Sequence, residues 1–230
     1  MEIIKSGVTG LDALLNGGFP KGSVTAISGP TGSGKSTLGM QFLVNGINQS
    51  KEPGLYIAIE ESYQSVHFHM SGYQWELDKL EKTKKLLFLD YPVLEVDQFL
   101  AQNSAIQEII NRVGIKRVVI DSVMPIALFF KEDDDRKKGF LKLMDNLRRW
   151  GTTTLIITED VPATTQDVLP STKYGIESFT DGWIHIYYLF SQKERERTRA
   201  VEVIKMKGIH HSSKIYPADI SKQGFVIYSK

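Results

Sequence analysis

The sequence predicts an α/β fold with a mostly parallel central sheet, helices on both faces and an antiparallel C-terminal extension. Three observations support this prediction: short apolar runs with little alternation, helical periodicity in the segments between them, and shorter gaps between runs after residue 183. With 230 residues, 41% hydrophobic and 24% charged, the chain has the composition of a globular protein. We predict that residues 1–230 form one domain.

Five apolar runs are expected to form strands of the parallel sheet, because β-branched and aliphatic residues without alternation are typical of strands covered on both faces. These runs are residues 23–28, 55–59, 86–89, 117–120 and 153–157. Helices are expected at residues 37–48, 65–77, 96–113 and 135–150. In the last helix, the apolar residues recur at helical spacing with charged residues between them, at Phe140, Leu143, Met144 and Leu147.

The C-terminal part of the chain has a different pattern. Residues 183–190 and 199–207, with a shorter run at 225–228, have strand-like sequences separated by shorter gaps. Short gaps favour antiparallel pairing, so we expect these residues to extend one edge of the sheet.

The composition excludes several classes of site. There is no cysteine, which rules out disulfides and thiolate metal sites, and neither His210-His211 nor the pair His67 and His69 predicts a metal site. The 28 Lys and Arg residues nearly balance the 27 Asp and Glu residues, so the net charge of +1 gives no broad attraction to nucleic acid. No stretch approaches the roughly 20 apolar residues of a membrane span, and the N-terminus lacks a signal-peptide core, which predicts a cytoplasmic protein.

A glycine-rich loop lies between the first of these strands and the first of these helices. Its sequence, Gly29-Pro30-Thr31-Gly32-Ser33-Gly34-Lys35-Ser36, fits the pattern GxxxxGK[S/T] of a P-loop in full. Glycines let backbone N–H groups surround a phosphate, and the following helix adds its N-terminal dipole. Lys35 is expected to bridge the β- and γ-phosphates and Ser36 to coordinate Mg²⁺, with Thr37 in the same binding segment. The loop therefore predicts a site for ATP and Mg²⁺.

Three carboxylates follow predicted strands at the same edge of the sheet. Asp121 ends the run 117–120, and Glu60 and Glu61 follow the run 55–59. Ligands bind at this edge in open α/β sheets. We expect Asp121 to hold the Mg²⁺ shell with Ser36 and Glu60, and one of the glutamates to orient or deprotonate the attacking water. By spacing alone, the two glutamates are equally well explained as a solvated pair at the start of the next helix.

Taken together, these motifs resemble the KaiC family of the RecA superfamily. The resemblance begins before the P-loop, at Gly10-Leu11-Asp12-Ala13-Leu14-Leu15 and Gly17-Gly18-Phe19-Pro20-Lys21-Gly22-Ser23. It continues through Ile59-Glu60-Glu61-Ser62, Asp121-Ser122-Val123 and Thr158-Glu159 to Glu202-Val203-Ile204-Lys205-Met206-Lys207-Gly208, His211 and Tyr216-Pro217. It covers nearly the whole chain. It implies a RecA-like P-loop NTPase that hydrolyses ATP in a homo-oligomeric ring, which we expect to be hexameric.

The resemblance also implies roles for individual residues. Glu60 and Glu61 match the family's paired catalytic glutamates. Lys205, Lys207 and His211 match positions that reach from one subunit to the γ-phosphate bound by its neighbour.

Two further positions complete the predicted nucleotide site. Arg199 matches a family position near the base and sugar, and Met206 lies within the same nucleotide-contacting segment as the two lysines. Independently of the family, Lys205 and Lys207 are two residues apart on a predicted strand, so both would project from one face. Lysines that protect an edge strand from pairing would have the same spacing.

The chain departs from the family pattern in several places. It has one ATPase domain where KaiC has two in tandem, so no clock role is implied. Lys207 stands where arginine is usual, which keeps the charge but loses the bidentate geometry, and Ile209 replaces a small hydroxyl residue. Ser178 lies where the second KaiC domain carries its phosphorylated pair, but Glu177 precedes it here, as in the non-phosphorylated domain, which predicts no regulated two-site phosphorylation.

Two other functions remain open. One is a nucleotide-dependent scaffold subunit with an unidentified protein partner, although the retained Glu60-Glu61 pair favours hydrolysis. The other is a recombinase-accessory ATPase similar to RadA paralogues, which would bind DNA through loops at residues 123–131 and 160–174. These loops have few basic residues, so nucleic-acid binding is not expected to be strong. The apolar pair Phe129-Phe130 in the first loop is a candidate for a subunit interface or the central channel of a ring.

Overall fold

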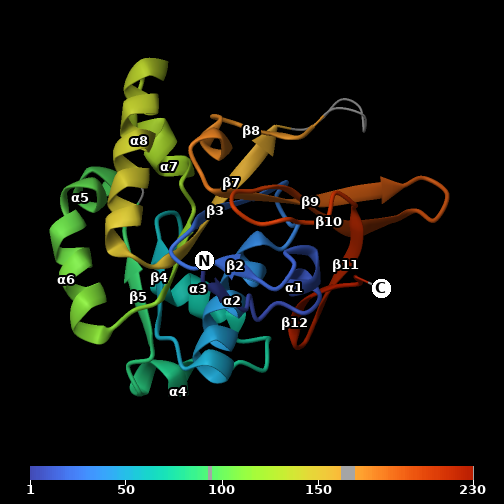
Figure 1. The fold of residues 1–230 in the computed structure, drawn as a ribbon, viewed down its shortest axis with the longest axis horizontal. Coiled ribbons are helices and arrows are strands. Elements are labelled where there is room, and N and C mark those ends of the chain that lie inside the picture. Colours follow the sequence, from blue (N-terminus) through green and yellow to red (C-terminus); the bar gives the residue numbers. More distant parts are fainter. Residues whose placement is uncertain (93–94, 162–168, 230) are drawn as a thin grey trace.

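The computed structural model describes residues 1–92, 95–161 and 169–229 and confirms the predicted α/β architecture (Figure 1). The main sheet has the strand order β12-β11-β10-β9-β3-β7-β6-β4-β5, and β8 pairs with the end of β7. Its strands are β3 (Val24–Gly29), β4 (Gly54–Ala58), β5 (Leu86–Asp90), β6 (Arg117–Asp121), β7 (Thr153–Val161), β8 (Ser171–Thr172), β9 (Gly182–Ser191), β10 (Glu196–Met206), β11 (Tyr216–Ser221) and β12 (Gly224–Ile227). A separate two-stranded sheet pairs β1 (Ile3–Ile4) with β2 (Phe19–Pro20).

The sheet divides into a parallel part and an antiparallel part. The strands β9, β3, β7, β6, β4 and β5 pair with one another in parallel. The strands β9, β10, β11 and β12 pair antiparallel in succession. The predicted C-terminal extension is thus confirmed, with the addition that β9 also pairs parallel to β3. Strand β11 was missed because its sequence contains a proline and no continuous apolar run.

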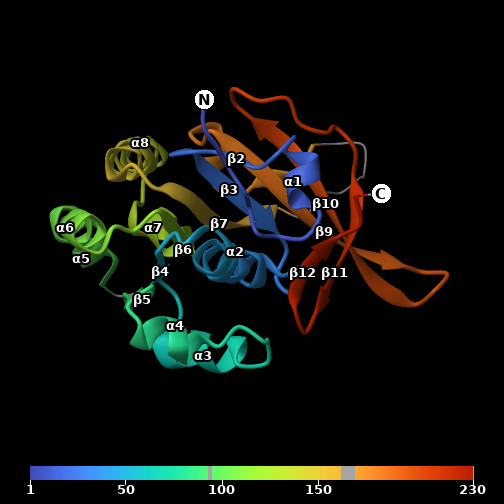
Figure 2. The ribbon, with the colours of Figure 1, turned by 60° about the horizontal axis from the view of Figure 1, so that its bottom comes forward.

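Helices pack on both faces of this sheet. They are α1 (Leu11–Leu14), α2 (Lys35–Ser50), α3 (Tyr63–Met70), α4 (Leu77–Lys82), α5 (Val96–Ala101), α6 (Asn103–Val113), α7 (Met124–Phe129) and α8 (Asp133–Trp150), with a 3₁₀ turn at Ile176–Ser178. Figure 2 shows α5 to α8 on one side of the sheet and α1 and α2 on the other. Each side has its own cluster of buried apolar residues. In the described ranges, no helix is both long and apolar enough to cross a membrane.

Two predicted helices are each interrupted. The helix expected at 65–77 ends at Met70, and α4 begins at Leu77. Between them, the rings of Tyr73 and Trp75 stack with centroids 4.3 Å apart, so burial of these two aromatic rings replaces continuation of the helix. The helix expected at 96–113 is likewise divided into α5 and α6.

The segment expected as a loop at 123–131 is largely the helix α7. Val123, Ile126 and Ala127 are buried in the same apolar cluster as residues of α8, which explains why the segment is more apolar than a solvated loop. Phe130 packs close to Gly139, where an added Cβ would lie 2.3 Å from the phenyl ring. Phe129 is half exposed and Phe130 is partly buried, so Phe129 is the more accessible member of the aromatic pair.

Arg117, the first residue of β6, holds the P-loop helix against the N-terminal segment. Its fully buried guanidinium pairs with Glu52 at 2.5 Å and donates hydrogen bonds to the backbone oxygens of Lys5 and Phe42. A Cβ on Gly46 of α2 would lie 2.3 Å from Nε, so a glycine is needed for this close approach. These contacts compensate the buried charge and fix α2 relative to β6, the two elements that bear Ser36 and Asp121.

Candidate nucleotide-binding site

The P-loop joins β3 to α2 at the carboxyl edge of the parallel strands. Gly29, Gly32 and Gly34 have φ angles of 153°, 82° and 103°, a region that favours glycine. A Cβ on Gly34 would also lie 2.6 Å from the side chain of Ile220. The 16-residue helix α2 begins at Lys35, and its N-terminus faces this loop. The local structure is therefore that of an anion-binding turn.

Lys35 is held inside the loop by backbone carbonyls. Its ammonium group donates hydrogen bonds to the oxygens of Gly29 at 2.8 Å and Pro30 at 3.0 Å. Burial lowers the pKa of Lys35, while the nearby carboxylates of Asp121 and Asp160 act in the opposite direction. A bound phosphate would give this ammonium group a charged partner in place of neutral carbonyls.

The groups around the P-loop fit a triphosphate with a divalent cation. Ser33 Oγ is buried and has no hydrogen-bond partner among the described residues, which leaves one polar atom of the loop free for a ligand. A pocket of about 360 Å³ lies against the loop. Its lining combines the phosphate-binding residues with oxygen ligands of the kind that Mg²⁺ prefers. These residues are Thr31, Gly32, Gly34, Lys35, Ser36, Thr37, Glu60, Glu61, Asp121, Ser122, Thr158 and Glu159.

Asp121 lies at the end of β6, on the sheet edge where the sequence predicted it. The hydroxyl of Tyr56, from the neighbouring strand β4, donates a hydrogen bond of 2.5 Å to its carboxylate. Burial raises the pKa of Asp121, and hydrogen bonds from Ser36 and Tyr56 partly counteract this effect. A carboxylate in this environment gains from a nearby cation, as expected of a group that helps to hold Mg²⁺.

The two adjacent glutamates have different surroundings. Glu61 accepts a hydrogen bond from Ser65 Oγ at 2.8 Å and lies 3.2 Å from Nδ1 of His69, so the first turns of α3 fix its carboxylate. Desolvation raises the pKa of Glu60, and the carboxylates of Asp121 and Glu159 add to this effect. The carboxylate of Glu60 therefore binds a proton more readily than that of an ordinary glutamate.

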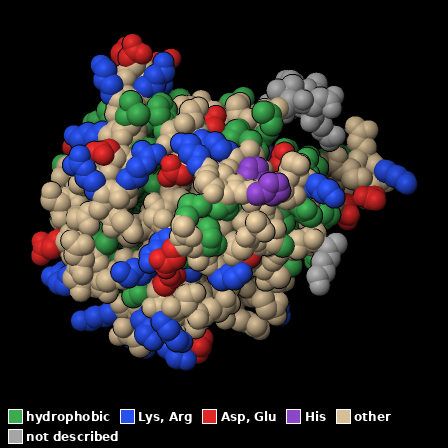
Figure 3. Space-filling view, viewed as in Figure 1, with side chains coloured by type: hydrophobic (Ala, Val, Ile, Leu, Met, Phe, Trp, Pro, Cys, Tyr) green, Lys and Arg blue, Asp and Glu red, His purple; other side chains and the backbone are tan. Residues whose placement is uncertain are grey.

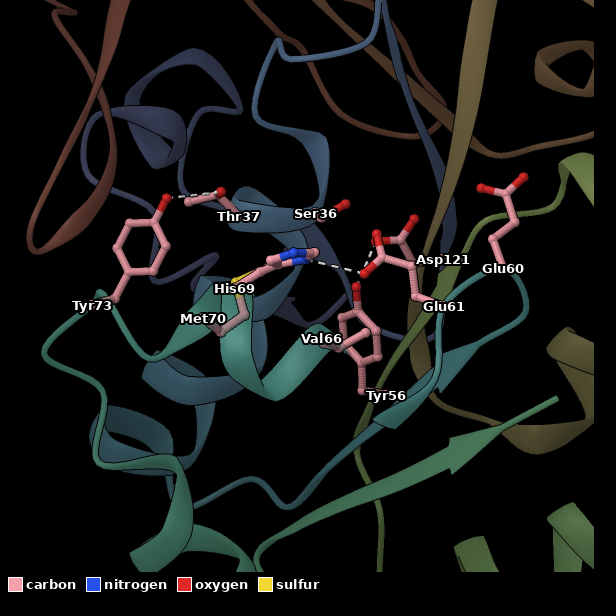
Figure 4. Close-up of a pocket in the computed structure, with 10 residues that line it drawn as sticks. All are labelled: Ser36, Thr37, Tyr56, Glu60, Glu61, Val66, His69, Met70, Tyr73 and Asp121. Carbon is pink, nitrogen blue, oxygen red and sulfur yellow. Dashed lines mark hydrogen bonds and ion pairs between the residues drawn. The ribbon is translucent and has the colours of Figure 1, made fainter. Parts of the chain in front are cut away.

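A second pocket, of about 290 Å³, continues from the P-loop toward α3 (Figure 4). Thr37 Oγ1 lies 3.1 Å from the hydroxyl of Tyr73, at the far end of this pocket. Figure 4 shows the Glu61 carboxylate directed toward His69, with Asp121 beside it and Glu60 standing apart. The site thus has an acidic part next to the P-loop and an aromatic part near Tyr73.

Arg199 of β10 contacts the P-loop of its own chain. Its guanidinium donates hydrogen bonds of 3.1 Å to the backbone oxygens of Ser33 and Gly32 and lies over the ring of Tyr188. The resemblance implied a place near the base and sugar, and the side chain does lie beside the phosphate-binding loop. It therefore satisfies two carbonyls of the loop.

The other predicted nucleotide residues of β10 lie far from their own P-loop. Across the sheet, Lys205 of β10 is paired with Trp183 of β9, which in turn is paired with Ala26 of β3. Ala26 lies near the start of β3, whereas the P-loop follows the end of that strand. Along β10, Lys205 is six residues from Arg199, which corresponds to about 20 Å. Lys205 therefore lies toward the opposite edge of the sheet.

The lysines contact the turn that precedes β9. Lys205 donates a hydrogen bond of 2.6 Å to the backbone oxygen of Glu177, and Lys207 lies 3.8 Å from the carboxylate of Asp181. Burial lowers the pKa of Lys205, and the charge of Lys207 lowers it further. Lys207 lies just beyond the strand, because β10 ends at Met206.

Two predicted site residues, Met206 and His211, and two hydroxyl residues, Ser178 and Thr180, also belong to this region. The side chain of Met206 is buried against Gly182, and His211 Nδ1 lies 3.0 Å from the backbone oxygen of Ser212. Ser178 is exposed, whereas Thr180 is fully buried with its hydroxyl 2.7 Å from the backbone oxygen of Gly182. The absence of regulated phosphorylation at Ser178 and Thr180 stays a prediction.

Sequence reasoning missed a buried polar group behind the P-loop. His185 of β9 is almost fully buried, with Nδ1 2.8 Å from the hydroxyl of Ser28, which also accepts a hydrogen bond from the indole of Trp183. Burial lowers the pKa of His185 to about 4, and the charge of Lys35 contributes. The signal was a histidine inside the apolar run 183–190. Tyr56 gave a similar signal in 55–59, as a hydroxyl group in an otherwise aliphatic strand.

Residues 4–230 match the family model described as "ATPase: KaiC". The chain belongs to the KaiC family. It is similar to a KaiC-like protein from the hyperthermophilic archaeon Pyrococcus horikoshii OT3, whose crystal structure is 35% identical and has a TM-score of 0.84, with 99% of each chain covered. The RecA-like fold implied by the motifs is therefore confirmed. This KaiC-family chain is an ATPase domain, and its membership implies that it binds a nucleotide.

Longer relatives are also similar to the chain. The circadian clock oscillator protein KaiC of Synechococcus elongatus is 29% identical over 228 residues, which covers 96% of this chain and 43% of the relative. That of Parathermosynechococcus lividus is 30% identical, covering 97% of this chain and 42% of the relative. The chain thus spans less than half the length of these relatives.

Proposed function

We propose that this KaiC-family domain hydrolyses ATP with Mg²⁺ in a homo-oligomeric ring, which we expect to be hexameric, and that each active site lies between two subunits. The observation that supports this most directly is the separation of the predicted site residues on one chain. The P-loop, Glu60, Glu61 and Asp121 meet at the carboxyl edge of the sheet, whereas Lys205 lies toward the opposite edge. A neighbouring copy is the natural source of the missing cations, because a head-to-tail interface that closes a ring brings opposite edges together.

In this proposal, each residue has a distinct task. The P-loop amides and Lys35 bind the phosphates, and bound Mg²⁺ would neutralise charge on the β- and γ-phosphates, held by Ser36 and the carboxylate of Asp121. Glu60 accepts the proton of the attacking water, because its raised pKa brings it closer to neutral pH than an ordinary glutamate. Glu61, fixed by Ser65 and His69, orients that water.

The reaction balances as a simple hydrolysis. The oxygen of water bonds to the γ-phosphorus, the bond between this phosphorus and the β–γ bridging oxygen breaks, and the water proton passes to Glu60. Lys205 and Lys207 of the neighbouring subunit stabilise the negative charge that moves onto the transferred phosphoryl group and ADP. The products are ADP and inorganic phosphate.

A subunit-mixing experiment tests the interface site. One variant, Glu60→Gln/Glu61→Gln, lacks the glutamates, and the other, Lys205→Ala, lacks the neighbour's cation, so each alone should be inactive. In a random equal mixture, about a quarter of head-to-tail interfaces combine intact glutamates with an intact lysine, so about a quarter of wild-type turnover should return. If the lysine acts on the P-loop of its own chain, mixing restores no activity, and the proposal fails.

A nucleotide-dependent scaffold is the second candidate, favoured if the wild-type protein binds ATP tightly without turnover. Light scattering with and without ATP and Mg²⁺ then measures whether nucleotide-dependent assembly is the functional output.

A DNA-binding role has less support. On the face shown in Figure 3, Lys and Arg side chains are interspersed with Asp and Glu. Of the second candidate DNA loop, residues 162–168 lie outside the described residues, and Ser171–Thr172 pairs back onto β7. We also propose that residues 1–230 form a single domain.

A further inference from the structure

Three potential metal ligands meet between α3 and α4, on the side of α3 away from the Glu61 contacts. Nε2 of His67 lies 3.1 Å from Oδ1 of Asp78 and 3.3 Å from Oε1 of Glu81. All three ligand atoms lie within 4.8 Å of one another. His67 belongs to α3, whereas Asp78 and Glu81 are three residues apart on α4 and therefore lie on one face of that helix.

These atoms are close together without being hydrogen-bonded. Nε2 of His67 and Oε1 of Glu81 are buried atoms, and neither has a hydrogen-bond partner within the described part of the chain. An ordinary ion pair of a protonated histidine would satisfy these atoms by directing the N–H group at one oxygen. The short separations without such a bond are those of ligand atoms around a common centre.

The separations agree with the size of a transition-metal ion. In a tetrahedral zinc site with bonds of about 2.0–2.1 Å, neighbouring ligand atoms are about 3.3 Å apart. One imidazole with two carboxylates is a ligand set for zinc-class ions, whereas Mg²⁺ prefers oxygen ligands and retains water. The Asp78 side chain is mostly exposed, which gives an ion access from solvent.

An outer hydrogen bond orients one of the ligands. The hydroxyl of Tyr63 donates a hydrogen bond of 2.8 Å to Oε2 of Glu81, leaving Oε1 directed at His67. The ring of Tyr63 also packs against the imidazole, with centroids 5.5 Å apart. Such outer-shell contacts are typical of metal sites, because they fix the direction of the ligand atoms.

We propose that His67, Asp78 and Glu81 bind a zinc-class divalent transition-metal ion, with a fourth position open to water. The sequence did not suggest this site, because the partners of the histidine are carboxylates on the next helix rather than cysteines. The ion cross-links α3 to α4. Since Ser65 and His69 of α3 hold Glu61, the bound ion also restrains the helix that positions this carboxylate.

The test uses the full chain after metal has been removed with a chelator and nucleotide has been removed. The protein is titrated with Co²⁺, and binding is followed by the visible absorption of the bound Co²⁺. The expected result is one equivalent bound with a tetrahedral spectrum, displaced by Zn²⁺, and a rise in melting temperature with Zn²⁺. His67→Ala should weaken binding at least tenfold, and Tyr63→Phe about tenfold through the lost outer contact. His69→Ala is the matched control from the same helix and should bind the metal as the wild type does.

Two results would overturn the proposal. One is the absence of binding by the wild-type chain at millimolar Co²⁺ or Zn²⁺, which would leave the cluster as an ion pair of a protonated histidine. The other is binding that His67→Ala does not weaken, which would place the ion elsewhere, for example at His210-His211. A His210→Ala variant distinguishes that location. Neither result depends on ATP hydrolysis, so the metal site and the proposed function are tested separately.

Discussion

The two ends of strand β10 make contacts of opposite kinds. At its first half, Arg199 bonds to the P-loop carbonyls of the same chain. Beyond its other end, Lys207 lies 3.8 Å from the carboxylate of Asp181, and Lys205 donates a hydrogen bond to a backbone oxygen of the same turn. One strand thus supports the nucleotide loop of its own chain and presents cations at the opposite edge, where its own chain offers them no triphosphate.

The two edges of the sheet also differ in the pKa shifts of their charged residues. At the carboxyl edge, burial and neighbouring carboxylates raise the pKa of Glu60, and burial raises that of Asp121. At the opposite edge, burial and Lys207 lower the pKa of Lys205. The carboxyl edge therefore holds carboxyl groups whose charged forms burial disfavours, and the opposite edge holds an ammonium group whose charged form burial disfavours. Association of opposite edges around ATP and Mg²⁺ would relieve both, which is why the comparison supports an interface site.

The largest expected effect comes from neutralising the acidic edge. Glu60→Gln/Glu61→Gln should lower ATP turnover by about 10³-fold, because water loses both its proton acceptor and its orienting group. The same change should raise the melting temperature of the nucleotide-free protein, since folding disfavours the charged form of Glu60. Turnover is measured by phosphate release and stability by calorimetry.

The control for this prediction is Glu108→Gln on the exposed face of α6, which removes a negative charge away from the site. It should change neither turnover nor melting temperature appreciably. If the double variant melted at a lower temperature than the wild type, the account of the acidic edge as a strained cluster of carboxylates would be wrong.

The next effect concerns pH and His185. Its pKa of about 4 in the folded chain lies below the value of about 6.5 in the unfolded chain, so the unfolded chain binds the proton first as the pH falls. The stability contributed by the neutral imidazole is complete above about pH 6.5 and is lost as the pH falls toward 4, up to about 3 kcal/mol. Carboxylates with raised pKa values change stability in the opposite direction over this range, so a variant is needed to isolate the histidine.

That variant is His185→Gln, compared with the wild type by urea denaturation at several pH values. The difference in unfolding free energy between the two proteins should shrink steadily between pH 6.5 and 4 and be constant above pH 7. A difference that is independent of pH would mean that the pKa of His185 is the same in the folded and unfolded chains.

A smaller effect on stability and ATP affinity is expected in the first half of β10, where Arg199 lies. Arg199→Ala removes two hydrogen bonds to the P-loop and should lower the unfolding free energy by roughly 1–2 kcal/mol, and ATP affinity by about tenfold. The matched control is Arg197→Ala, since Arg197 also lies over Tyr188 but makes no contact with the loop in the described structure. Equal effects of the two changes would indicate that stacking on Tyr188, rather than support of the P-loop, is what matters.

These contrasts also explain what the sequence could predict. The P-loop and the Asp121 strand end are local patterns, so their places at the carboxyl edge follow from the order of strands and helices. The support of the P-loop by Arg199, the contact of His185 with Ser28 and the Tyr56 bond to Asp121 depend on which strands become neighbours, information that no local pattern contains. The interruption of the helix predicted at 65–77 likewise depends on stacking of Tyr73 on Trp75, which only the packed chain can show.

The smallest predicted effect concerns Lys207, just beyond the end of β10. Lys207→Arg restores the side chain usual in the family, whose planar group can bind two phosphate oxygens at once, and should raise turnover by a few-fold at most. Lys207→Ala should lower it more strongly, because the charge itself is lost. Both changes should leave ATP binding by the isolated subunit unaltered, since the residue lies away from its own P-loop. Reduced ATP binding by monomeric Lys207→Ala would instead mean that the far end of β10 acts on its own chain, and the two ends would no longer serve different sites.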